Sequence, residues 1–205
     1  MLIIGLTGGI ASGKNFVADI FYKKFRIPNF DADLAVHEIY RHNSAILKQI
    51  KKHFPSAVVN NQINRDKLAN LVLKDNQLLL ILENIIHPQV KKKQEEFIKR
   101  CQRRHCKAII LNIPLLFEKQ GYKKCHKSIL VSAGKFVQKQ RFLKRVKKHK
   151  SDASLNDYAL KFDRIISNQM PDSQKKKLAD FIVYNGLNKG RTVSQITKII
   201  KKLKL

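Results

Sequence analysis

The sequence predicts an α/β protein with a five-stranded parallel sheet and a helical insertion. The chain opens with a short apolar run, Leu2 to Leu6, that ends in glycines, as a buried parallel strand does. Further apolar runs alternate with helical patterns along the chain. Residues 34 to 104 read almost entirely as helix, which is too much for one crossover of a βαβ unit. We therefore expect a helical subdomain inserted after the second strand.

The composition indicates a folded protein with an anionic ligand. Hydrophobic residues make up 43% of the 205 residues, enough for one α/β domain with a sizeable core. Lys and Arg number 42 against 15 Asp and Glu, a formal net charge of +27. These basic residues are spread along the chain and are not interleaved with aromatic ones. This favours a lysine-rich composition with an anionic small substrate over a dedicated nucleic-acid partner.

The apolar runs, the N-terminal segment and the cysteines together predict a cytoplasmic protein. No apolar run approaches the roughly 20 residues that cross a bilayer, and the N-terminus lacks the basic start of a signal peptide. We therefore expect a cytoplasmic protein without a membrane partner. Cys101, Cys106 and Cys125 are odd in number and match no zinc spacing. The cysteines predict neither a disulfide framework nor a metal site.

Each expected strand is a short apolar run stopped by glycine, proline or polar residues. The five strands are expected at Leu2 to Leu6, Arg26 to Phe30, Ala108 to Asn112, Ser128 to Ala133 and Ala179 to Gly186.

The helices follow from apolar spacing. The first begins at Lys14, because the apolar residues after it recur at three- and four-residue spacing. Within the insertion, Pro88 suits the first turn of a helix, and "PSAVVNNQIN" reads as a turn between two helices. Three further helices are expected in "GKFVQKQRFLKRVKKHK", in "SDASLNDYALKFDRIISNQM", which opens with a capping residue, and in "VSQITKIIKKLKL".

The stretch "GLTGGIASGKN" predicts a phosphate-binding loop of the kind found in P-loop NTPases, whose core is a three-layer α/β/α sandwich. Gly8 and Gly13 stand at the required spacing before Lys14, after a strand and before a helix. Glycines let backbone N–H groups converge on phosphate oxygens, the helix N-terminus adds its dipole, and the lysine reaches the β- and γ-phosphates. The loop comprises Gly8, Gly9, Ile10, Ala11, Ser12, Gly13, Lys14 and Asn15.

Asn15 departs from the pattern, which has Ser or Thr at this position to coordinate Mg²⁺. Its carboxamide oxygen suits a hard cation and offers direct coordination, coordination through a water, or a loose hold. The alternative is a loop that binds phosphate and no longer catalyses. We expect retained activity with ATP and Mg²⁺, because the remaining parts of such a site are present.

Two further groups carry chemistry. Asp31 and Asp33 follow the second strand, where a carboxylate accepts the proton of an attacking hydroxyl or holds Mg²⁺ through water. The alternative for Asp33 is a helix N-cap. Arg141 and Arg145 are one helical turn apart and suit a clamp on transferring phosphates, the alternative being a solvated basic helix.

Together these segments resemble the dephospho-coenzyme A kinase family over nearly the whole chain. The segments that carry the resemblance are "GLTGGIASGK", "DADLAVHEIY", "IIHPQV", "IPLLFE", "QKQRFLKR", "RIISNQM" and "QKKKLADFIVYN". The resemblance implies ATP-dependent phosphorylation of the 3′-hydroxyl of dephospho-coenzyme A. It also implies a kinase core of residues 1–33, 106–140 and 176–205, a helical substrate domain at 34–105, and a lid at 141–175.

The resemblance also implies roles for single residues. Lys14, Asp33, Arg141 and Arg145 would form the catalytic set, and Asn185 would face the adenine. The substrate side would be lined by Asp33, His87, Pro88, Pro114, Leu115, Leu116 and Glu118. Asn112 is a second departure, because many members carry an acidic residue there. The competing interpretations are another small-molecule or nucleotide kinase, and a degenerate protein that binds ATP or nucleic acid without transfer.

Overall fold

The computed structural model describes residues 1–147, 155–186 and 188–205. It divides the chain into two compact units, Met1–Phe30 with Cys101–Leu205, and Asp31–Arg100. The second unit is the helical insertion that the sequence predicts after the second strand.

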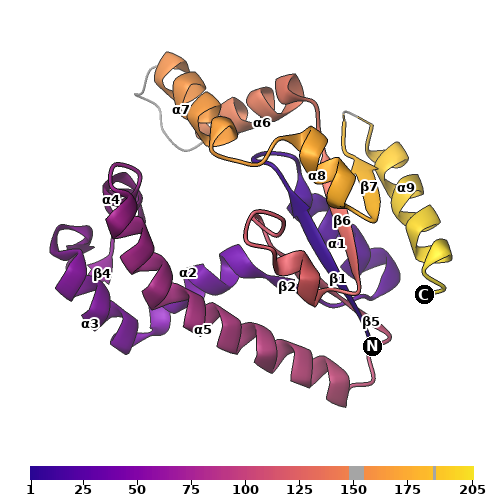
Figure 1. Ribbon diagram of the computed structural model, residues 1–205, viewed down its shortest axis with the longest axis horizontal. Coiled ribbons are helices and arrows are strands. Elements are labelled where there is room, and N and C mark those ends of the chain that lie inside the picture. The colour runs from indigo at the N-terminus through magenta and orange to yellow at the C-terminus, as the bar shows by residue number, and fades with distance from the viewer. Residues whose placement is uncertain (148–154, 187) are drawn as a thin grey trace. The chain divides into compact units, whose positions relative to one another are not determined.

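The first unit is built on a five-stranded sheet of order β2-β5-β1-β6-β7 (Figure 1). The strands are β1 (Leu2–Gly8), β2 (Asn29–Asp31), β5 (Ala108–Asn112), β6 (Lys127–Ser132) and β7 (Phe181–Tyr184). The central strand β1 pairs in parallel with β5 on one side and β6 on the other. In an open α/β sheet, this reversal of strand order opens a crevice at the carboxyl ends of the strands, where ligands bind.

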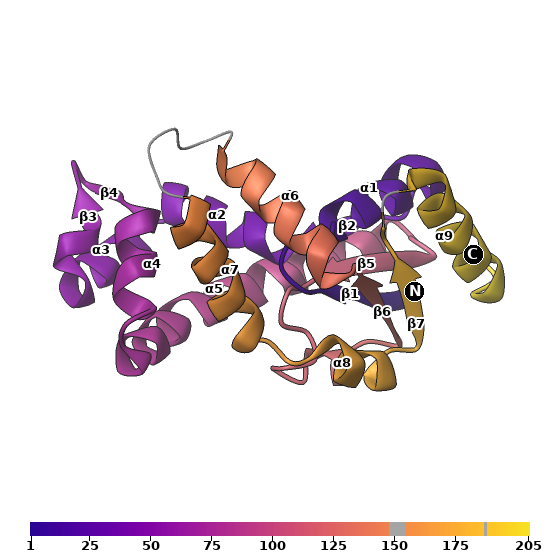
Figure 2. The same cartoon turned by 90° about the horizontal axis from the view of Figure 1, so that it is seen from above.

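Helices on both faces of this sheet complete three layers. On one face, α1 (Lys14–Phe25) and α9 (Lys189–Lys202) bury Phe21 and Ile196 against the strands. The helix α8 (Asp172–Leu178) lies over the other face (Figure 2). The central strands β1, β5 and β6 each contain a run of buried apolar residues because both faces are covered, and all five residues of β5 are buried. The predicted fold class is confirmed.

A helical pair, α6 (Lys135–Lys147) and α7 (Leu155–Ser167), follows β6, and a 3₁₀ turn (Gly121–Lys124) precedes that strand. The rings of Phe142 and Phe162 pack 5.6 Å apart between the two helices. Residues 148–154 lie outside the described residues. The expected end of the basic helix and the expected capping residue of the next helix both fall in this range.

The helical unit has its own core, formed by Ile39, Ile50, Phe54, Leu68 and their neighbours. Its elements are α2 (Ala32–His42), α3 (Ser44–His53), a 3₁₀ turn (Pro55–Ala57), β3 (Val58–Val59), β4 (Gln62–Ile63), α4 (Arg65–Val72) and α5 (Asn76–Arg103), the last of which continues into the first unit. The expected turn is a hairpin between β3 and β4, in which two asparagines take positive φ angles of 50° and 57°.

Two local expectations and one alternative are wrong. The second strand was expected at Arg26 to Phe30, whereas β2 is Asn29–Asp31. Pro88 lies inside α5 and not in a first turn. Helical sequence on both sides carries the helix through, although proline removes one backbone donor and crowds the preceding turn. The N-cap of α2 is Asp31, whose carboxylate accepts a hydrogen bond from the Leu34 amide at 3.1 Å. Asp33 lies in the first turn of that helix and is not its cap.

Candidate active site

The glycine-rich loop connects β1 to α1 at the carboxyl end of the central strand. Gly13 has a φ angle of 84°, a left-handed conformation that favours glycine, and Ala11 shares that region at 54°. The Ser12 amide donates to the Gly9 carbonyl at 3.1 Å, which closes the loop on itself. A side chain at Gly8 would meet the Ser12 hydroxyl at 2.5 Å and the Val131 carbonyl at 2.6 Å. The packing therefore requires glycine at this position.

Two side chains hold the Ser12 carbonyl from outside the loop. The side-chain NH₂ group of Asn185 donates to it at 2.8 Å, and the Arg141 guanidinium donates to it at 3.2 Å. We call Arg141 and Asn185, which both donate to this carbonyl, the clamp. Because the peptide is planar and trans, the N–H of Gly13 points in the opposite direction from this carbonyl. The clamp thus sets the direction of a backbone donor, which is what a phosphate loop needs.

Arg141 makes more contacts than the one with the Ser12 carbonyl. It also donates to the carbonyls of Asn185 at 3.0 Å and of Gly186 at 2.5 Å, the residues that follow β7. Asn185 is only 3% exposed, and its side-chain oxygen accepts from the Thr192 hydroxyl of α9 at 3.3 Å. The structure therefore places Arg141 and Asn185 against the loop backbone and ties the loop to α6 and α9.

Two glutamines that the sequence analysis did not single out contact the tip of the loop. The Ile10 amide donates to the Gln169 side-chain oxygen at 3.2 Å. A side chain at Gly9 would come within 2.9 Å of the Gln138 amide nitrogen and 3.4 Å of the same Gln169 oxygen. Gln138 lies three residues before Arg141 on α6, and this helical spacing is the one local signal that associates it with the loop.

The interior of the loop fits a phosphate group. Lys14 opens α1 and is only 8% exposed, so its charge is carried into the site. The Ser12 hydroxyl is buried without a hydrogen-bond partner in the protein. A buried polar atom that lacks a partner costs free energy, which a ligand that satisfies it recovers. A helix N-terminus, a buried lysine and this hydroxyl together match the chemistry of an anionic ligand.

The second residue of α1, Asn15, is exposed. Its side-chain oxygen accepts a hydrogen bond from the Asn112 side-chain amide at 3.1 Å. Among the residues that the structure describes, no cluster of three or more His, Cys, Asp or Glu side chains is placed to hold a metal ion.

The two arginines have different surroundings. Arg145 is exposed, and its guanidinium lies 5.8 Å from the centre of the Phe142 ring. Arg141 contacts the loop backbone, as described above. In this conformation the two guanidinium groups therefore do not form a single clamp.

The "IPLLFE" segment after β5 is held to the core. The Thr7 hydroxyl donates to the Pro114 carbonyl at 2.7 Å, and Leu116 is fully buried, whereas Leu115 is exposed. Glu118 pairs with the buried ammonium of Lys175 at 2.8 Å and accepts from the Met170 amide at 3.2 Å. Its second carboxylate oxygen is buried without a hydrogen-bond partner. Glu118 therefore links this segment to the residues around α8.

Within the helical unit, His87 and Pro88 are exposed on α5, and Asp33 lies in the first turn of α2. A hollow of 380 Å³ in the same unit is lined by residues of α2 and α5, the N-terminus of α3 and the residue between α2 and α3. Its charged lining residues are Glu38, His42, Lys92, Lys93 and Glu96.

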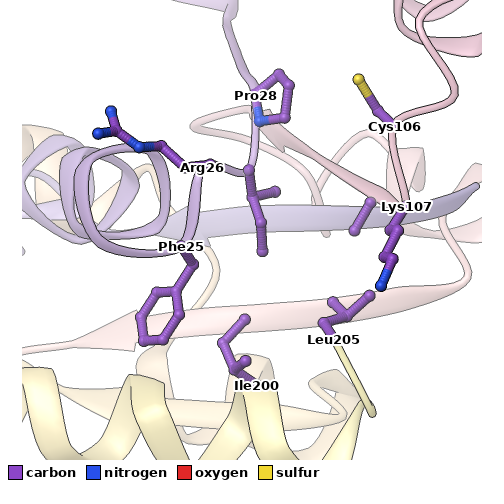
Figure 3. Close-up of a pocket in the computed structure, with 9 residues that line it drawn as sticks. Phe25, Arg26, Pro28, Cys106, Lys107, Ile200 and Leu205 are labelled. Carbon is purple, nitrogen blue, oxygen red and sulfur yellow. The ribbon is translucent and has the colours of Figure 1, made fainter.

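Another hollow, of 270 Å³, lies at the amino ends of β2 and β5, away from the phosphate loop. Figure 3 shows Phe25, Ile200 and Leu205 around it, whereas the Arg26 side chain extends away. Its lining is largely apolar and includes no residue of the loop, so the candidate active site is not there.

These features define the class of protein. A phosphate loop after the central strand of a parallel sheet, together with a helical insertion after the second strand, is the build of a P-loop nucleotide-binding protein. None of the described helices is long and apolar enough to cross a membrane.

Comparison with known proteins identifies the family. The family model described as dephospho-CoA kinase matches residues 2–189. A dephospho-CoA kinase of Bartonella quintana is 41% identical over 99% of this chain and 98% of its own length. That of Ehrlichia canis is 37% identical over 98% of this chain and 95% of its own. The chain belongs to the dephospho-CoA kinase family.

Solved structures agree with this assignment. The crystal structure of TT1252 from Thermus thermophilus superposes with a TM-score of 0.81 at 30% identity, over 98% of this chain and 97% of the other. The dephospho-CoA kinase from Campylobacter jejuni superposes with a TM-score of 0.67 at 25% identity, over 98% and 96%. The likeness therefore covers both units of the chain.

Proposed function

We propose that this protein transfers the γ-phosphoryl group of ATP to the 3′-hydroxyl of dephospho-coenzyme A, which gives coenzyme A in the last step of its biosynthesis. The observation that carries the proposal is the family match from residue 2 to 189, a range that includes the phosphate loop. The products would be coenzyme A and ADP. The O–P bond to ADP breaks as the ribose oxygen bonds to phosphorus, and the hydroxyl loses its proton.

In this proposal the loop residues Gly8 to Lys14 bind the β- and γ-phosphates. The clamp on the Ser12 carbonyl supports this role, because it aims the Gly13 amide away from that carbonyl. The ammonium of Lys14 offsets charge that develops on the transferred group. Mg²⁺, when it accompanies ATP, would neutralise phosphate charge.

Asp33 is the proposed acceptor of the proton from the attacking hydroxyl. Its companion Asp31 is already engaged as the N-cap of α2. Asp33 follows it in the first turn, where a carboxylate is stabilised by the helix dipole. A carboxylate at this place is able to accept a proton or orient the hydroxyl.

The helical unit, with His87 and Pro88, and the segment from Pro114 to Glu118 would line the substrate side. Glu118 would act by holding its segment, because Lys175 and the Met170 amide engage it. Arg145 would bind phosphate as a lid arginine of residues 141–175. The lid, the adenine contact of Asn185 and the cytoplasmic location stay predictions.

The test is coenzyme A formation by the purified protein from ATP, Mg²⁺ and dephospho-coenzyme A, with Lys14→Ala as the control. We expect product with the natural sequence and none above background with the variant. Comparison with nucleoside monophosphates as acceptors separates this activity from that of a nucleotide kinase. ATP binding without transfer to any acceptor would contradict the proposal and favour a degenerate loop.

A further inference from the structure

Two asparagines from distant parts of the chain meet beside the phosphate loop. Asn112 ends β5, is fully buried, and lies opposite Leu6 of the central strand. Asn15 is in the first turn of α1. The side-chain amide of Asn112 donates to the side-chain oxygen of Asn15 at 3.1 Å.

This pair changes what the loop offers to a ligand. In P-loop proteins a hydroxyl at the position of Asn15, together with an aspartate, holds Mg²⁺. Here the position carries a carboxamide whose oxygen, its metal-binding atom, is directed to the buried Asn112 by the hydrogen bond between the two side chains. The pair is neutral, whereas a protein site for Mg²⁺ uses one or two carboxylates together with the phosphates.

The other end of the Asn15 side chain is an NH₂ group with two donors. Asn15 is exposed in the first turn of α1, and the N-terminus of a helix attracts phosphate. We propose that Asn112 orients Asn15 so that Asn15 donates hydrogen bonds to nucleotide phosphate instead of coordinating Mg²⁺. This inference rests on the proposed nucleotide binding. Asn112 is the positioning residue of the pair. Phosphate oxygens and water molecules, and not Asn15, then coordinate Mg²⁺.

The experiment measures the dissociation constant of ADP and of a non-hydrolysable ATP analogue by calorimetry, with Mg²⁺ and with EDTA. For the natural sequence we expect the two conditions to differ less than about threefold. Asn15→Ala removes a donor to a charged group, which is worth about tenfold in affinity. That loss should be equal with and without Mg²⁺. If Asn15 coordinated Mg²⁺ instead, Asn15→Ala would bind the Mg²⁺–nucleotide complex more weakly but would bind the nucleotide in EDTA as the natural sequence does.

Asn112→Asp tests the orientation. A carboxylate at 112 accepts from the Asn15 NH₂ group and turns the Asn15 oxygen outward. This variant should bind nucleotide at least about tenfold more weakly in EDTA than in Mg²⁺, which a loss of structure would not produce. Gln102→Glu is the matched control, because Gln102 is exposed on α5 and gains the same charge beyond the amino end of β5. We expect it to behave like the natural sequence.

A second measurement needs no substitution at a buried residue, so misfolding of a variant does not affect it. The Asn15 side-chain NH₂ signals, assigned by their loss in Asn15→Ala, should shift in a ¹⁵N–¹H spectrum when ADP is added in EDTA. Unshifted signals, or tenfold weaker binding by the natural sequence in EDTA, would overturn the proposal. Failure to bind nucleotide at all would overturn it together with the phosphate-loop assignment. Because every readout is nucleotide binding, absence of coenzyme A formation alone would refute only the proposed function.

Discussion

At the scale of single residues, the phosphate loop is shaped from outside by Arg141. Its guanidinium donates to three carbonyls, those of Ser12, Asn185 and Gly186. The planar fork of arginine suits several acceptors at once, whereas a lysine ammonium is a compact point charge on a flexible stem. The position therefore depends on the geometry of the side chain as well as on its charge.

We predict that Arg141→Lys weakens ATP binding by about tenfold, because a hydrogen bond to a charged group contributes about 1.5–3 kcal/mol and at least one is lost. Calorimetric titration with ATP measures the change. Arg103→Lys is the control, since Arg103 is exposed at the end of α5 and has no part in the proposed site. Equal affinities in both variants would show that the clamp does not shape the phosphate site.

Asp33 and Asp31 make a matched pair for testing the proposed base. Asp33→Asn should lower kcat by about 10²–10⁴-fold, the usual contribution of general base catalysis, and leave ATP affinity nearly unchanged. Asp31→Asn should have little effect, because asparagine caps a helix about as well as aspartate. Steady-state assays of both variants separate the two roles. A comparable loss in both would indicate damage to α2 instead.

The residue scale also shows where prediction from sequence ends. The spacing of Gly8, Gly13 and Lys14 is local, so the loop was predictable from one segment. The contact of Gln169 with Ile10 spans 159 positions, and that of Asn112 with Asn15 spans 97. No periodicity connects such residues, because the sheet order and the path of the chain after α7 bring them together. These contacts require the fold.

At the scale of elements, strands were easier to predict than helix ends. β5 was predicted to the residue because a run of apolar residues is stopped by Pro114. The helix α5 was divided wrongly at Pro88, since the local rule for proline is outweighed by helical sequence on both sides. The alternative that Asp33 caps α2 is wrong, because the strand before it ends at Asp31 and that residue is the cap.

One carboxylate, that of Asp180 just before β7, adds hydrogen bonds to the start of β6. Asp180 accepts from the Ser128 amide at 2.9 Å, from the Ser128 hydroxyl at 2.7 Å and from Lys127 at 3.1 Å. Burial alone would raise the pKa of Asp180, but these hydrogen bonds and the nearby ammonium outweigh it and hold the pKa below its ordinary value. The folded state therefore favours the ionised form.

We predict that Asp180→Asn is less stable than the natural sequence at neutral pH and that the gap narrows in acid. Because the folded pKa is depressed, the stabilisation is present above the unfolded value of about 3.9 and is lost as the pH falls through the folded value. Urea unfolding of both proteins from pH 7 down to about pH 3 measures the gap. A gap that stayed constant would show that the carboxylate charge contributes nothing.

At the scale of the whole molecule, the excess of positive charge is the dominant physical property. The chain carries 42 basic against 15 acidic side chains, so most cations have no acidic partner available. Among the described residues, most ion pairs join exposed side chains, for example Lys93 with Glu38 at 2.7 Å. Such pairs contribute about 0–1 kcal/mol each, which is small against the repulsion of a net charge of +27.

Self-repulsion of this size predicts that salt stabilises the fold. Raising ionic strength from about 0.1 M to about 1 M shortens the screening length from about 10 Å to about 3 Å and weakens repulsion more than it weakens the few surface pairs. We expect Tm to rise with NaCl, by about 2–4 °C for each kcal/mol of repulsion removed. Calorimetric scans in NaCl, with sucrose as an uncharged control, measure the effect. A Tm that fell with salt would mean that the cations are arranged in stabilising pairs, and the charge would then call for a structural explanation of its own.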